Sequence, residues 1–325
     1  GRPRMSRAPV LRRAQAGFSL LEVLITTGIL AGAAYVALST VEIDTGRHRY
    51  EMTEQRLDAI RRALAGEPGL VANGAPVVSG YVADVGQLPP CLQALVEREA
   101  DCDDDGTADF SPQAYALTDD VIAFGWRGPY LSARDGAYPD AWGNGDATPD
   151  FGWAVTATGA GPVTDIDVVS LGRDRAVGDT LGDGGFDQDE TQTVGAVDVT
   201  VPLVASGLAV AFSNDTAAPL AYCAALAVPD PADLTDWTYI VGTSAPVTIP
   251  DGDSLSIPFS AAATATIGAR VLAIYDSANA NVNAVDCAID AGFEDDVFTA
   301  AETFRFPVLI APYAVPAASF AARRS

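Results

Sequence analysis

The stretch that decides the fold is Gly17-Phe18-Ser19-Leu20-Leu21-Glu22, with the apolar run that continues from it to Val41. Glu22 is the only charged residue between Phe18 and Val41. The run has about 24 residues, which is enough for one helical crossing of a bilayer core. A carboxylate inside such a run is costly in lipid, so Glu22 marks a functional position.

The flank that precedes this run is basic. It contains no acidic residue and five arginines, namely Arg2, Arg4, Arg7, Arg12 and Arg13. Because basic flanks stay in the cytoplasm, we expect the chain after the helix to lie outside. In an alternative interpretation of this flank, translation starts at Met5.

Two simpler interpretations of the apolar run stay open. One is an ordinary secretory signal peptide that is cut near Ala31-Gly32-Ala33. The other is a plain single-span anchor. Neither accounts for a Gly-Phe junction followed by a glutamate. Gly28 and Gly32 form a GxxxG pair, which is compatible with close helix packing.

The Gly17-Phe18 junction, with Glu22 as the fifth residue counted from Phe18, resembles the class III signal of type IV pilins and type II secretion pseudopilins. The resemblance implies that a prepilin peptidase removes residues 1–17 and N-methylates Phe18. It also implies a helical filament. A carboxylate buried in that filament needs a positive partner, which the amine of Phe18 in a neighbouring copy would supply.

The helix is expected to continue beyond the membrane to about Ala65. Tyr50, Leu57 and Leu64 recur every seven residues, and Thr53 and Ile60 lie between them, so the stripe is amphipathic. The sequence Gly-Glu-Pro-Gly at 66–69 then ends the helix. We therefore predict one helix over 18–66, whose second half packs against a globular head.

Five motifs in the next segment are similar to the major pseudopilin of type II secretion, so that the resemblance covers residues 17–190. They lie at 84–89, 92–96, 126–131, 140–144 and 168–174. Two positions depart from the family pattern, since Leu88 replaces a tyrosine and Ala141 replaces a proline. For this head, at 67–190, we expect a small antiparallel sheet of three or four strands that includes 151–157 and 165–170.

Residues 191–325 lie outside the pseudopilin pattern and contain many short runs of apolar and β-branched residues. The predicted strands are 197–204, 208–213, 221–227, 237–242, 254–259, 269–275, 283–288 and 303–311. Turn residues separate them, which is typical of an antiparallel β-sandwich. The predicted fold class is thus α+β, with a long N-terminal helix, a small antiparallel sheet and an all-β C-terminal domain.

The composition limits the partners of the part outside the membrane. The net charge is −24, and all 19 basic residues are arginine. Such an acidic surface argues against nucleic acid as a partner. The four cysteines, Cys91, Cys102, Cys223 and Cys287, lie beyond the membrane helix. In an oxidising compartment their neighbourhood in sequence favours the pairs Cys91–Cys102 and Cys223–Cys287, and four free buried thiols are the alternative.

Two acidic loops are candidate calcium sites. The pseudopilin family binds calcium after its Leu-Gly motif, and the resemblance implies Leu171 (through its carbonyl), Asp174, Asp187 and Asp189 as ligands here. The second loop, at 101–109, has the Asp-x-Asp-x-Asp-Gly start of an EF-hand loop. It offers Asp101, Asp103, Asp105 and Asp109, but Pro112 stands where a bidentate glutamate belongs. The alternative for both loops is a solvated acidic turn.

No catalytic motif is evident. The only histidine, His48, lies on the predicted helix without a nucleophile near it in sequence, and we expect no enzyme. The glycosylation sequon at Asn214-Asp215-Thr216 is interpreted as chance.

The sequence favours a structural subunit of a type IV pilus-like or type II secretion pseudopilus filament. Its expected partners are further copies of itself, other pilins or pseudopilins, the prepilin peptidase and an inner-membrane assembly platform. The expected location is the inner membrane with the head outside, and after assembly a periplasmic or extracellular filament. The main alternative is a minor pilin or adhesin whose segment 191–325 binds a surface or partner. A membrane-anchored enzyme is a third and weaker hypothesis.

Overall fold

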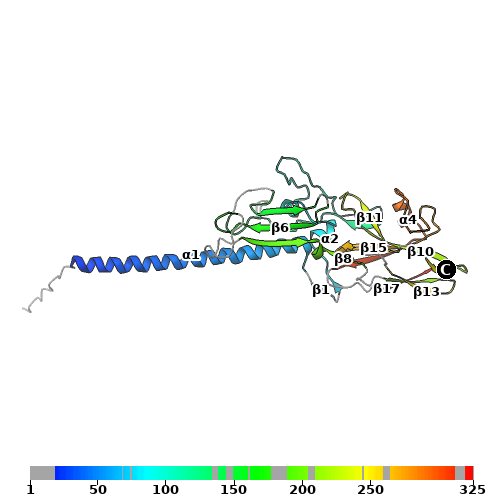
Figure 1. Cartoon of the computed structure of the whole chain (residues 1–325), viewed down its shortest axis with the longest axis horizontal. Coiled ribbons are helices and arrows are strands. Elements are labelled where there is room, and N and C mark those ends of the chain that lie inside the picture. The colour runs from blue at the N-terminus through cyan, green and yellow to red at the C-terminus, as the bar shows by residue number, and fades with distance from the viewer. Residues whose placement is uncertain are drawn as a thin grey trace, which may run out of the picture. The chain divides into compact units, whose positions relative to one another are not determined.

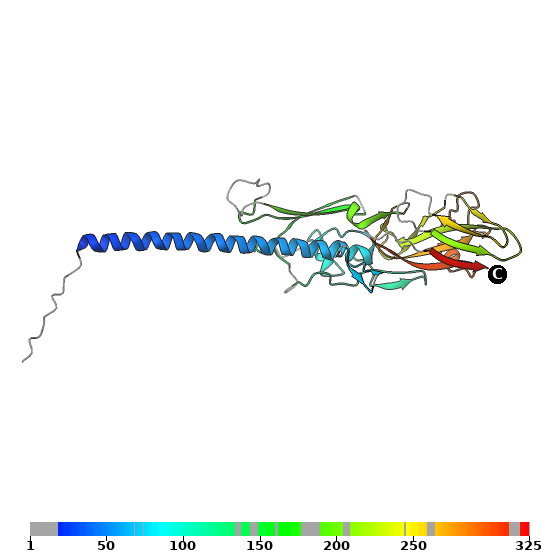
Figure 2. The same ribbon diagram turned by 90° about the horizontal axis from the view of Figure 1, so that it is seen from below.

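The computed structural model describes most of the chain (Figures 1 and 2). The described residues are 19–67, 69–73, 75–133, 138–143, 149–159, 162–176, 189–203, 209–243, 245–258, 264–311 and 319–324. The chain divides into two compact units, residues 1–49 and 50–325, and each is described by itself. Helix α1 (Leu20–Ala65) contributes to both.

The described part of the first unit is the N-terminal portion of α1, drawn in blue in Figure 1. Ser19 precedes the helix, and its hydroxyl oxygen accepts a hydrogen bond from the backbone N–H of Glu22 at 3.2 Å. Serine satisfies a free N–H group of the first turn in this way. The large apolar side chains between Leu20 and Ile43 are exposed. The predicted long apolar helix is therefore confirmed.

The C-terminal portion of α1 belongs to the second unit and is amphipathic. Its buried positions include Thr53, Leu57, Ile60 and Leu64 of the predicted stripe, whereas Tyr50, the first position of the stripe, is partly buried. The helix ends at Ala65 and is followed by Gly66, whose φ is +77° and where a Cβ would collide with the carbonyl of Ser79. Only glycine fits both conditions, which explains why the helix ends before this residue.

Several short elements follow α1. They are β1 (Val71–Ala72), β2 (Ala75–Pro76), α2 (Tyr81–Val85), the 3₁₀ helix η1 (Leu92–Leu95), β3 (Ala116–Thr118) and β4 (Ile122–Phe124). A three-stranded antiparallel sheet then forms in the order β5 (Ala154–Thr158), β6 (Asp165–Ser170) and β7 (Glu190–Gly195). The alternate residues Ile166, Val168 and Ser170 of β6 are buried, as expected for a strand with one face on the core. The predicted strand at 165–170 is confirmed.

Three further sheets occupy the rest of the described chain (Figure 2). The largest has the order β11 (Trp237–Val241), β10 (Leu220–Pro229), β15 (Gly268–Asp276) and β16 (Phe304–Ile310), with β12 (Val247–Ile249) also paired to β10. The second has the order β13 (Ser254–Pro258), β9 (Ala209–Asn214) and β17 (Ser319–Arg324). The third pairs β14 (Thr264–Thr266) with β8 (Thr200–Pro202).

Three predictions for this segment were wrong. Residues 196–199 form the short helix α3 (Ala196–Val199) rather than the start of a strand, because the Asp198 side chain accepts a hydrogen bond from the backbone N–H of Gly195 at 3.0 Å. Residues 283–288 form turns, since the side chains of Asn283 and Asp286 each accept a hydrogen bond from a backbone N–H two residues later. Strand β17 runs parallel to β9, so the sheets are not all antiparallel.

The hydrophobic packing joins residues on both sides of position 190. One cluster contains Leu57, Ile60 and Leu92 together with Val199 and Ile267. Another contains Ile122 and Phe124 of β4 together with Cys223 and Tyr275 of the largest sheet. The second unit is thus a β-rich body of mixed α+β structure whose buried clusters cross the predicted boundary at 190.

Both predicted disulfides are present. Cys91 is bonded to Cys102, and Cys223 is bonded to Cys287, so no cysteine is left as a thiol. The first bond closes a short loop beside η1. The second connects β10 to the turn region that precedes α4 (Glu294–Thr299).

Candidate functional site

The first candidate site is the start of α1. Gly17 and Phe18, the predicted cleavage junction, lie outside the described residues. Glu22 lies in the first turn of α1 and is exposed. The N-terminal end of a helix carries a partial positive charge, which favours a carboxylate at this position. Exposed Leu20, Leu21 and Val23 surround it in sequence, so a charged group stands on an apolar surface.

The apolar part of α1 meets the length and composition of a membrane span. Its best 18-residue window has a mean hydropathy of 1.8, and none of that window is buried within the chain. A helix of this kind near an N-terminus is compatible with a membrane anchor or with a signal sequence. Its apolar side chains are exposed in the described part of the first unit, so they require burial in lipid or against other helices.

A second group of residues brings two of the sequence motifs together. The hydroxyl of Tyr130 donates to Asp84 Oδ2 at 3.1 Å and accepts from the backbone N–H of Arg127 at 3.0 Å. The guanidinium of Arg127 lies 3.5 Å from Asp84 Oδ1 and is placed over the ring of Tyr115, 3.9 Å from its centre. Burial raises the pKa of the Asp84 carboxyl, and the nearby Arg127 charge partly opposes this shift.

The other motifs meet through similar contacts. The indole N–H of Trp126 donates to the carbonyl of Ala94 at 3.0 Å, which connects the motif at 126–131 to η1. The hydroxyl of Ser170 donates to the buried carboxylate of Asp140 at 2.9 Å, which connects the motif at 140–144 to β6. These hydrogen bonds hold the segments that carry the motifs in place.

The acidic loop at 101–109 brings three of its four predicted ligands together. Carboxylate oxygens of Asp101, Asp103 and Asp109 lie within 4.8 Å of one another. Asp105 is not part of this group, and its side chain accepts a hydrogen bond from the N–H of Thr107 at 2.8 Å.

The loop is closed at its base by an antiparallel bridge between Ala100 and Phe110 and by the disulfide of Cys102. The pKa of the Asp103 carboxyl is raised by partial loss of hydration and by the neighbouring carboxylates. A divalent cation would relieve this repulsion, and oxygen ligands suit calcium, which takes six to eight of them. The three carboxylates would therefore supply part of a coordination shell.

The described residues of the other predicted calcium loop are not grouped in this way. The carbonyl of Leu171 accepts a hydrogen bond from the N–H of Arg175 at 3.1 Å, and Asp174 Oδ1 accepts one from the N–H of Ala176 at 3.0 Å. Asp189 is half-buried, and Asp187 lies outside the described residues. Within the part of the chain that the structure describes, the group of Asp101, Asp103 and Asp109 is the one set of three close metal-ligating side chains.

Two further predicted positions are placed by the structure. His48 is exposed on α1 in the first unit. Asn214 of the sequon is fully buried, and its amide donates to the carbonyls of Ala218 and Ile249, each at 2.8 Å. The Asn214 amide therefore serves to connect two backbone segments.

Sequence reasoning missed Arg270, which is only 1% exposed. Its guanidinium donates to the Thr266 hydroxyl at 2.8 Å, to the Ile267 carbonyl at 2.6 Å and to the Ala83 carbonyl at 3.4 Å. Burial lowers the pKa of Arg270 to about 9. One signal was available in the sequence, namely a single arginine within the otherwise uncharged run at 268–275.

Comparison of the chain with protein-family models, with curated proteins and with solved structures finds no match.

Proposed function

We propose that this chain is a structural subunit of a type IV pilus-like or type II secretion pseudopilus filament. A prepilin peptidase removes residues 1–17 and methylates the new N-terminal Phe18. The mature chain waits in the inner membrane, with residues 50–325 outside, until an assembly platform adds it to the filament. Its partners are further copies of itself and other pilins or pseudopilins.

The observation that carries this proposal is the exposure of the apolar part of α1. Between Leu20 and Ile43 its large apolar side chains are exposed among the described residues, whereas Leu57 and Ile60 further along the same helix are buried. A helix that is apolar and unpacked at one end needs lipid before assembly and neighbouring helices afterwards.

The position of Glu22 supports the same proposal. It is the only acidic residue in the apolar run and lies in its first turn. In a filament its carboxylate would be removed from water. Leaving one charge of a buried ion pair without its partner destabilises a protein by about 3–5 kcal/mol, so this carboxylate needs a positive partner. The amine of Phe18 in a neighbouring copy is the positive group that docking would place beside it.

The experiment compares filament assembly by the wild type, Glu22→Ala and Asp44→Ala in cells that process the chain. Asp44 is an exposed acid on the same helix beyond the apolar run, so it controls for loss of charge. We expect Glu22→Ala to accumulate in the membrane without forming filaments and Asp44→Ala to assemble. Mass spectrometry of the mature chain should find methylated Phe18 at its N-terminus. Normal assembly of Glu22→Ala, or a mature chain cut elsewhere, would refute the proposal.

A second candidate function is that of a minor pilin or adhesin. It is favoured by the size of the β-rich part after residue 200, which has a five-stranded and a three-stranded sheet and the disulfide Cys223–Cys287. In this case that part binds a surface or a partner, and α1 only attaches it. The abundance of the chain in a purified fibre distinguishes the two functions. A bulk subunit repeats along the whole fibre, whereas a tip subunit is scarce.

A further inference from the structure

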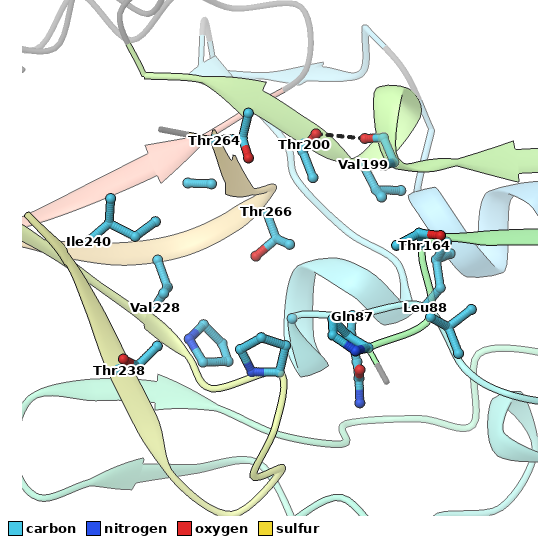
Figure 3. Close-up of a pocket in the computed structure, with 17 residues that line it drawn as sticks. Gln87, Leu88, Thr164, Val199, Thr200, Val228, Thr238, Ile240, Thr264 and Thr266 are labelled. Carbon is cyan, nitrogen blue, oxygen red and sulfur yellow. Dashed lines mark hydrogen bonds between the residues drawn. The ribbon is translucent and has the colours of Figure 1, made fainter. Parts of the chain in front are cut away.

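A pocket with a volume of about 290 Å³ lies in the second unit, and none of the sites described above uses it. Its walls come from the loop after α2, the loop before β6, α3, the ends of β10 and β11, and β14. In Figure 3, Val228, Thr238 and Ile240 lie on one side of the open space, and Gln87, Leu88 and Thr164 lie on the opposite side.

The lining of this pocket has an unusual composition for this chain. None of its lining residues that the structure describes is charged, although the chain carries a net charge of −24. None is aromatic either, and the apolar walls are built from aliphatic side chains and three prolines, Pro162, Pro229 and Pro231. A charged ligand would lose its hydration here without gaining an opposite charge. An aromatic ligand would find no ring to pack against. The walls therefore select an uncharged aliphatic molecule.

Threonine hydroxyls supply the polar groups of the pocket. The Thr266 hydroxyl oxygen accepts a hydrogen bond from the buried guanidinium of Arg270 at 2.8 Å, so its own proton remains available to a ligand. The hydroxyls of Thr238 and Thr264 make no hydrogen bond with the described residues. Donors of this kind suit a ligand that carries an acceptor oxygen, such as the carbonyl of an ester.

The walls are held in place by contacts outside the open space. Gly86 has a φ of +97°, and a Cβ at this position would lie 2.6 Å from Pro229 Cβ, so the two segments are in close contact. Arg270 fixes the opposite wall through its bonds to Thr266 and Ile267. A preformed pocket binds without the cost of ordering its own side chains.

We propose that this pocket binds a small, uncharged aliphatic molecule with one acceptor oxygen. A cavity of about 150 Å³ holds benzene, so this pocket has room for about twelve non-hydrogen atoms. Binding does not require assembly of the chain, and so it is independent of the proposed filament function.

The test uses two probes of equal size, methyl nonanoate and its isomer decanoic acid, which at neutral pH is ionised to decanoate. The full chain in a lipid nanodisc is titrated with each probe, and hydrogen–deuterium exchange is followed in peptides covering 228–240 and 264–267. Exchange in these peptides reports on the pocket, whereas partition of a probe into the lipid does not alter it. Thr238→Asp places a carboxylate in the pocket, and Thr248→Asp places one at the exposed middle position of strand β12 in the same sheet. Thr264→Asp is a second pocket variant for use if Thr238→Asp does not fold.

We expect methyl nonanoate to protect both peptides in a saturable manner and decanoate to leave them unchanged. Thr238→Asp or Thr264→Asp should weaken the binding of the ester by about tenfold or more, because the new carboxylate loses hydration when the pocket fills. Thr248→Asp should bind like the wild type. The proposal is overturned by absence of protection, by equal binding of decanoate, or by a pocket variant that binds as the wild type does.

Discussion

The Tyr130 hydroxyl donates a hydrogen bond to the Asp84 carboxylate across 3.1 Å, although 46 residues separate the two in sequence. The bond joins α2 to the motif at 126–131, and Arg127 places its charge on the other oxygen of the same carboxylate. The hydrogen bond from Tyr130 and the charge of Arg127 each contribute little stability alone. Together they satisfy a carboxylate that the fold has largely removed from water.

The first prediction concerns the pH dependence of stability at Asp84. Burial raises its pKa above the usual 3.8, so the folded state holds this proton more tightly than the unfolded state. Protonated Asp84 therefore stabilises the folded state at a pH below the pKa that it has in the unfolded chain. This stabilisation is lost as the pH rises through the pKa that Asp84 has in the folded chain. We expect the stability of Asp84→Asn relative to the wild type to increase between about pH 3 and pH 6 in denaturant titrations.

The companion variant Tyr130→Phe tests a contact that opposes this shift. The Tyr130 hydroxyl of the wild type stabilises the ionised Asp84 carboxylate. Removal of this hydroxyl should therefore raise the pKa of Asp84 further and lower the free energy of unfolding by about 1 kcal/mol at neutral pH. A constant difference between Asp84→Asn and the wild type over the whole pH range would show that burial does not raise this pKa.

The second prediction compares two glycines with positive φ. A Cβ at Gly268 would collide with the Ala83 carbonyl and with the Arg270 guanidinium, whereas a Cβ at Gly252 would meet nothing within 4 Å. Gly252→Ala should therefore cost only the backbone strain, about 1 kcal/mol. Gly268→Ala should cost about 3 kcal/mol or more, because packing must also shift. Chemical denaturation measures the free energy of unfolding of both variants. Equal losses would show that the close contact with Ala83 does not affect stability.

The third prediction concerns the two disulfides. Cys223 and Cys287 are 64 residues apart, and Cys91 and Cys102 are 11 apart. In the chain-entropy model, closing the longer loop stabilises the fold by about 4 kcal/mol and closing the shorter one by about 3 kcal/mol. Replacing each pair by alanines and measuring unfolding under oxidising conditions tests this order. A larger loss from the shorter loop would instead point to native-state packing as the dominant effect.

The fourth prediction concerns calcium at the loop 101–109. Since Asp101, Asp103 and Asp109 place their oxygens together, calcium should raise the midpoint of thermal unfolding of the wild type. The rise should be lost in Asp103→Ala and retained in Asp290→Ala, an exposed aspartate of a distant turn. The measurement is thermal unfolding with calcium and with a chelator. An equal rise in both variants would show that the ion binds elsewhere.

The parts of the fold that could be predicted are those with a strong local pattern. The apolar run and the stripe at 50–64 define α1, since a helix with this periodicity buries one face. Runs rich in β-branched residues, such as 237–242 and 269–275, correspond to β11 and β15. The apolar side chains of these runs favour both burial and an extended backbone, so the sequence alone predicts a strand.

The wrong and missing elements have physical causes that lie outside such patterns. At 283–288 the side chains of Asn283 and Asp286 bond to nearby backbone, and this local bonding outweighs the apolar residues between them. Strand β17 was not predicted because Ser319–Arg324 pairs in parallel with β9, more than a hundred positions earlier in the chain. A pairing so distant leaves no local trace.

The candidate sites were predictable to the extent that their residues are adjacent in sequence. The loop 101–109 carries its ligands within nine positions, so composition alone indicated the cluster of Asp101, Asp103 and Asp109. The pocket was not predictable, because its walls come from segments as distant as Gln87 and Thr266. Only the three-dimensional fold brings those uncharged residues together.

The contact between Gly86 and Pro229 has a practical consequence for anyone who wishes to engineer this chain. The C-terminal β-rich part cannot be exchanged at position 190 without loss of packing. A chimera joined there would lose the contact of Gly86 with Pro229, and it would remove Ile267 from the cluster that contains Ile60. Foreign sequences are better inserted at a turn such as Asp251-Gly252, where the structure leaves open space.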